Sequence, residues 1–70
     1  MHLEQLVITL KQRREELGVT QEQLADLSGV GLRTLKALES KKSNPTLETL
    51  TKLADVLGME FKLEVKKVES

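Results

Sequence analysis

Two cationic side chains, Arg33 and Lys36, lie three residues apart in the segment GVGLRTLKALE, residues 29–39. Residues at this spacing share one face of an α-helix, so a helix here would present a guanidinium and an ammonium side by side. A guanidinium donates a rigid fork of hydrogen bonds, whereas an ammonium is a flexible point charge. The segment therefore predicts a surface for an anionic or acceptor-rich partner.

The cations of the chain are unevenly distributed. Eleven Lys and Arg balance eleven Asp and Glu overall, so the net charge gives no support to nucleic-acid binding. Residues 31–44 are nevertheless locally basic, because they contain four cations and one acid: Arg33, Lys36, Lys41 and Lys42 against Glu39. Two isolated charges on a helix are usually an ordinary solvated face, so the neighbouring elements must decide what this face does.

Several other chemistries are not expected. With no cysteine and His2 as the single histidine, a conventional zinc site cannot be assembled. Glu15 and Glu16 are adjacent on a helix and diverge, so they indicate solvated surface rather than a catalytic pair. We therefore expect no enzyme and no cofactor. Phe61 is the only aromatic residue, which argues against binding of single-stranded nucleic acid, since that depends on stacking.

The chain also lacks the signals of a membrane or exported protein. No apolar run approaches the roughly 18 residues that a membrane span requires, and the start, MHLEQLVITL, has neither the basic region nor the cleavage site of a signal peptide. A cytoplasmic location is the default expectation.

Seventy residues suffice for one small domain, and the apolar spacing predicts four short helices. We expect them at about residues 3–17, 21–28, 32–40 and 47–57, the second burying Leu24, Ala25 and Leu27. Gly18 and Gly58 end the first and the fourth. Thr20 and Gln23 have the form of a capping box, and Thr46 is a plausible cap of the fourth helix.

The second and third helices are separated by the turn SGVG, in which Gly29 supplies a left-handed conformation and Val30 fills the corner. On a wheel of 100° per residue, the third helix has Thr34, Leu35 and Leu38 on one side and Arg33, Lys36 and Ala37 on the other. Two short helices joined in this way, the second with a cationic outward face, are typical of a helix-turn-helix. The second helix of that motif enters the major groove of DNA.

Residues 17–58, LGVTQEQLADLSGVGLRTLKALESKKSNPTLETLTKLADVLG, resemble the lambda-repressor or Cro/XRE family of helix-turn-helix proteins. The shared features are the L-G-x-T-Q-x-x-L-A run, the apolar residue at the turn and the closing N-P-x-x-x-x-L-x-x-L-A-x-x-L-G. The resemblance implies an all-α bundle of four to five short helices that binds double-stranded DNA.

The family pattern also assigns residues. It places base contacts at Leu32, Arg33, Lys36 and Ala37, of which Arg33 suits a guanine and Leu32 and Ala37 suit thymine methyl groups. Backbone contacts fall at Thr20, Gln21, Lys41, Lys42, Ser43 and Asn44. A structural ion pair is implied between Arg14 and Glu39, which could otherwise be two unrelated surface charges. Gly31 departs from the pattern, because a serine or threonine is usual there.

From Glu60 the hydrophobic pattern changes to strict alternation, which predicts a β-strand. A lone strand on a helical domain has no partner in its own chain, so we expect a homodimer in which Phe61, Leu63 and Val65 pair with a second copy. The expected organisation is a DNA-binding domain at residues 1–58 and a dimerisation element at residues 59–70. A frayed tail is the alternative.

The sequence thus predicts a dimeric, sequence-specific DNA-binding regulator on a palindromic operator. A repressor is the first expectation, and a weaker resemblance to HipB-type antitoxins adds a toxin protein as a further candidate partner. The rival interpretation is a protein-interaction module that binds DNA only incidentally.

Overall fold

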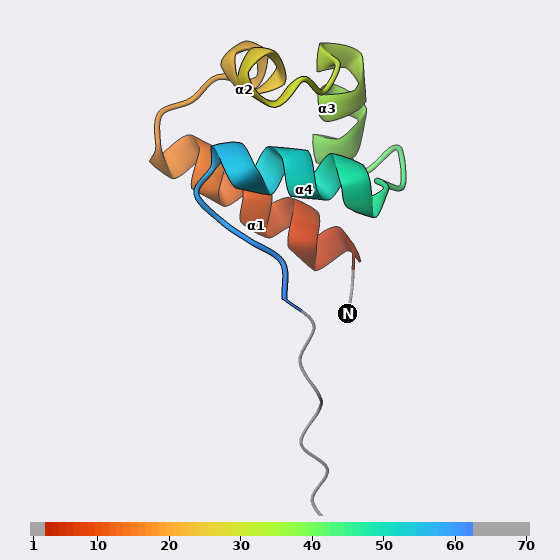
Figure 1. Cartoon of the computed structure of the whole chain (residues 1–70). Coiled ribbons are helices and arrows are strands. Elements are labelled where there is room, and N and C mark those ends of the chain that lie inside the picture. Colours follow the sequence, from red (N-terminus) through yellow and green to blue (C-terminus); the bar gives the residue numbers. More distant parts are fainter. Residues whose placement is uncertain (1–2, 63–70) are drawn as a thin grey trace, which may run out of the picture.

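The computed structural model describes residues 3–62, which form four α-helices and, within that range, no strand. The helices are α1 (Leu3–Glu16), α2 (Gln21–Ser28), α3 (Leu32–Glu39) and α4 (Leu47–Val56). In Figure 1, α1 and α4 cross the lower part of the domain, and α2 and α3 lie above them. The all-α class and the four helices agree with the sequence prediction to within one residue at each boundary.

Local signals set the helix ends. The hydroxyl of Thr20 accepts from the backbone N–H of Gln23, and the Gln23 side chain accepts in turn from the Thr20 N–H, which completes the predicted capping box. Thr46 caps α4 by accepting from the N–H of Thr49. Gly31 occupies the N-cap of α3 without a side-chain hydrogen bond, because it has no side chain to offer.

One hydrophobic core joins all four helices. Its members are aliphatic, and the fully buried ones are mostly leucines that recur at helical spacing. The core consists of Val7, Leu10, Leu24, Ala25, Val30, Leu35, Leu38, Leu50, Leu53, Ala54 and Leu57. A domain of this size has only one such cluster to stabilise it, so every helix contributes to the position of the others.

Two predictions about burial are wrong. Leu27 was expected in the core but is 67% exposed, because the short helix α2 turns only Leu24 and Ala25 inward. Thr34 was placed with the buried side of α3 and is exposed. Both residues lie at the border of an apolar face, where the sequence wheel cannot say how far the neighbouring helix extends.

The predicted carboxy-terminal strand is not supported. Residues 59–62 form no strand, and Phe61 packs half-buried on the core of its own chain, beside Leu6 and Met59. The Lys62 ammonium lies 3.4 Å from a carboxylate oxygen of Glu60. A single extended segment docked on a core alternates with the same period as a paired strand, so alternation alone could not distinguish them. Leu63 and Val65 lie outside the described residues.

Candidate nucleic-acid interface

The junction between α2 and α3 is a tight turn fixed by three residues. Gly29 adopts a left-handed φ of 78° and its N–H bonds to the Ala25 carbonyl at 3.0 Å, which ends α2. Val30 is buried in the core, as predicted, and its N–H donates to the Ser28 hydroxyl at 3.2 Å. The turn is therefore anchored both by its backbone and by its apolar side chain.

The outward face of α3 exposes the two cations that the sequence singled out. Arg33 and Lys36 are exposed, and Ala37 is half-buried. Neither cation forms an ion pair with another residue of the described range 3–62. Leu32 differs from them, because it packs partly buried against the core cluster. The structure thus leaves Arg33 and Lys36 available for a partner and turns Leu32 mostly inward.

Sequence reasoning missed one residue on this face. Ser40, the C-cap of α3, is exposed, and its hydroxyl donates to the Ala37 carbonyl at 3.1 Å. Seven residues advance a helix by nearly two turns, so Ser40 and Arg33 are separated by only about 20° around the helix axis. That spacing was the signal that could have identified it.

The loop after α3 carries the predicted backbone-contact residues Lys41, Lys42, Ser43 and Asn44, all of them exposed. Lys41 has a left-handed φ of 63°. Its ammonium lies 3.2 Å from a carboxylate oxygen of Glu4 on α1, so this cation already has a partner. Lys42 forms no ion pair among residues 3–62.

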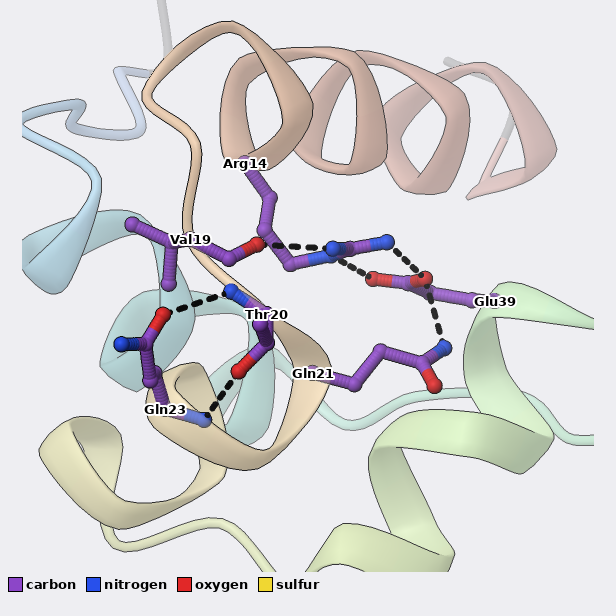
Figure 2. Close-up of polar contacts among 6 residues, drawn as sticks. All are labelled: Arg14, Val19, Thr20, Gln21, Gln23 and Glu39. Atoms are coloured by element: carbon purple, nitrogen blue, oxygen red, sulfur yellow. Dashed lines mark hydrogen bonds and ion pairs between the residues drawn. The ribbon is translucent and has the colours of Figure 1, made fainter.

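A polar network connects the start of α2 to the end of α3 (Figure 2). The Arg14 guanidinium donates from Nε and Nη2 to the two carboxylate oxygens of Glu39, at 2.9 Å each. Its Nη1 donates to the Val19 carbonyl at 2.8 Å. The Gln21 side chain donates from Nε2 to Glu39 Oε1 at 2.9 Å. The structure therefore brings together the two residues of the implied ion pair and adds Gln21 to them.

The network is shielded from solvent. The Arg14 and Glu39 side chains are 11% and 5% exposed. The hydrogen bond to Glu39 raises the pKa of Arg14 above its ordinary value, against the opposing effect of desolvation, and other nearby carboxylates act in the same direction. Arg14 thus remains charged at any physiological pH, and Glu39 has its charge balanced.

Within residues 3–62, no group of three or more His, Asp or Glu side chains could hold a metal ion. None of the described helices is long and apolar enough to cross a membrane.

Comparison with known proteins identifies the family. The family model HTH_3, described as helix-turn-helix, matches residues 10–63, which include α2, α3 and α4. The matched range therefore includes both helices that carry the candidate interface, α2 and α3.

Individual relatives agree with this match. An uncharacterized HTH-type transcriptional regulator of Haemophilus influenzae is 37% identical over 93% of this chain and 66% of its own length. The HTH-type transcriptional regulator SutR of Escherichia coli is 35% identical over 93% of this chain and 36% of its own. The transcriptional repressor RstR of a cryptic CTXphi phage in Vibrio cholerae is 42% identical over 69% of this chain and 43% of its own.

The chain spans less than two thirds of the length of each of these three relatives. Their names give no support to the resemblance to HipB-type antitoxins. The capped α2, the glycine turn, the exposed cations of α3 and the family match together show that this chain belongs to the helix-turn-helix family of DNA-binding transcriptional regulators.

Proposed function

We propose that this protein binds double-stranded DNA sequence-specifically by inserting the outward face of α3 into the major groove. The observation that supports this most directly is the pair Arg33 and Lys36, exposed on a helix whose opposite face is held in the core. Arg33 would donate bidentately to a guanine, and Lys36 to a guanine acceptor or a phosphate. Ala37 and the exposed part of Leu32 would contact thymine methyl groups.

Phosphate contacts would flank this face on two sides. Gln21 begins α2, where free backbone amides and the helix dipole favour an anion, and Thr20 precedes it. Lys42, Ser43 and Asn44 would meet the backbone beyond the end of α3. The charge of Lys41 is already offset in part by Glu4, so we expect this lysine to contribute less than Lys42.

Regulation would be repression by occupancy of an operator, a mode that needs no further surface on the protein. One relative, RstR, is named a transcriptional repressor, which supports this direction of control. We further propose that two copies bind together, because a single α3 reads only a few base pairs. Two recognition helices about 34 Å apart would match a palindromic operator.

The test is fluorescence anisotropy on duplexes that tile the region upstream of the protein's own gene, at several salt concentrations. Arg33→Ala and Lys36→Ala should weaken binding to one palindromic duplex by about 10- to 100-fold and relax sequence preference. Lys52→Ala, which removes an exposed lysine of α4, is the matched control and should bind like the wild type. Equal, weak binding by all four proteins to every duplex would refute the proposal.

A protein-interaction module is the competing function, and the structure offers one observation in its favour. Leu17 and Leu27 are both exposed and line the same open groove between the end of α1 and α2. Salt separates the two functions, because phosphate contacts impose a steep loss of affinity with added salt and an apolar protein interface does not.

A further inference from the structure

We propose that Glu39, the last residue of α3, is a positioning residue. Its carboxylate orients the side-chain amide of Gln21, so that the amide nitrogen is held ready to donate a hydrogen bond to a DNA phosphate. This inference rests on the proposed function, since it concerns how the same interface binds DNA. It assigns Glu39 a role in binding in addition to its ion pair with Arg14.

The chemistry of the contact determines the orientation of the amide. A side-chain amide presents an oxygen that only accepts and a nitrogen that only donates, and the two can exchange places by rotation. An ionised carboxylate only accepts hydrogen bonds. The atom of Gln21 that lies 2.9 Å from Glu39 Oε1 must therefore be Nε2, and the remaining hydrogen of that nitrogen is left to donate elsewhere. Without the carboxylate, either edge of the amide could face the DNA.

The carboxylate itself is held rigidly. Glu39 is 5% exposed at its side chain and accepts from Arg14 on both oxygens, and Arg14 is fixed in turn by the carbonyl of Val19. Val19 immediately precedes the N-cap of α2. The Gln21 side chain is thus fixed by groups from α1, the α1–α2 connection and α3 (Figure 2). A glutamine ordered before binding loses less side-chain entropy when it meets a phosphate.

The charge balance of the network suits a phosphate site. An unpaired Glu39 would place a negative charge 2.9 Å from the Gln21 nitrogen, where it would repel the phosphate that Gln21 contacts. The bidentate bond from Arg14 offsets that charge. Glu39 can therefore orient the donor without repelling the phosphate.

The test is a double-mutant cycle on operator affinity. Gln21→Ala is measured in the wild type and in the paired variant Arg14→Met, Glu39→Met, which removes both buried charges and leaves apolar side chains. We expect Gln21→Ala to weaken binding about tenfold in the wild type and less than about threefold in the paired variant. Lys42→Ala removes a phosphate contact outside the network, so its cost should be the same in both backgrounds.

The outcomes separate the two levels of the proposal. Equal costs of Gln21→Ala in both backgrounds, with specific binding intact, overturn the role of Glu39 alone. Absence of specific duplex binding by the wild type overturns the proposed function and this inference with it.

A second measurement needs neither a variant nor DNA. In the wild type, NMR should show slower solvent exchange at the side-chain amide of Gln21 than at that of Gln12, which is exposed on α1. Equal exchange at the two amides would show that Glu39 does not hold Gln21, and would overturn the inference even if the paired variant failed to fold.

Discussion

Replacing Arg14 with methionine removes the main partner of a carboxylate that is 5% exposed at its side chain. Three hydrogen bonds are lost, two to Glu39 and one to the Val19 carbonyl. Removal of one member of a buried pair costs about 3–5 kcal/mol, because the other charge stays desolvated and unpaired. In so small a domain water lies close to the pair, so we expect the lower end, about 3 kcal/mol.

That loss is large for this chain. At about 0.05–0.15 kcal/mol per residue, a domain of this size has a free energy of unfolding of about 4–10 kcal/mol. With a urea m value of about 1 kcal/mol/M, the midpoint of urea unfolding should be about 3 M lower for the Arg14→Met variant than for the wild type. Circular dichroism of the helical signal against urea measures the shift directly.

The paired variant Arg14→Met, Glu39→Met is the control, since it removes the unpaired charge as well. Its free energy of unfolding should be within about 1 kcal/mol of the wild-type value, because only the Val19 carbonyl and the Gln21 amide then lack their partners. A paired variant as unstable as the single one, or a single variant that shifts by less than about 1 M, would refute the desolvation argument.

The same pair predicts how stability depends on alkaline pH. The pKa of Arg14 is raised in the folded state, chiefly by its hydrogen bond to Glu39. A raised pKa of a cation contributes stability that is fully present below the unfolded pKa and is lost only as pH rises through the folded one. Arg14 titrates so far above neutrality that the cost of Arg14→Met should be the same at about pH 7 and pH 9.

Substitutions at three further positions test local features, each by thermal or urea unfolding. Gly29→Ala should destabilise by about 1–2 kcal/mol, because its φ of 78° disfavours a Cβ although no atom obstructs one; an unchanged midpoint would contradict this. Lys41→Gly should be about 1 kcal/mol more stable than Lys41→Ala, since both lose the Glu4 ion pair and only glycine relieves the φ of 63°; equal stabilities would count against strain at this position. Thr20→Ala should lower the free energy of unfolding by about 1 kcal/mol, because it removes the acceptor for the Gln23 N–H. A loss smaller than that caused by the same replacement of an exposed threonine elsewhere on the chain would show that the capping box is dispensable.

The sequence by itself determined the features that depend on neighbouring residues. Thr20 and Gln23, three residues apart, complete each other's hydrogen bonds, so these two residues were enough to predict where α2 begins. Gly29 ended the same helix through its own backbone conformation. Arg33 and Lys36 were assigned to an exposed face because the spacing of Leu35 and Leu38 placed the opposite face in the core.

Only the tertiary structure determined which residues from distant parts of the chain contact each other. Gln21 meets Glu39 across 18 residues, and Lys41 meets Glu4 across 37, contacts that exist only because of how the helices cross. Phe61 packs on its own core rather than showing a strand within the described residues, because an extended segment can satisfy its alternating pattern against any apolar surface within reach. Local hydrogen bonding is encoded over three or four residues, whereas the partner of a surface side chain depends on the packing of the whole domain.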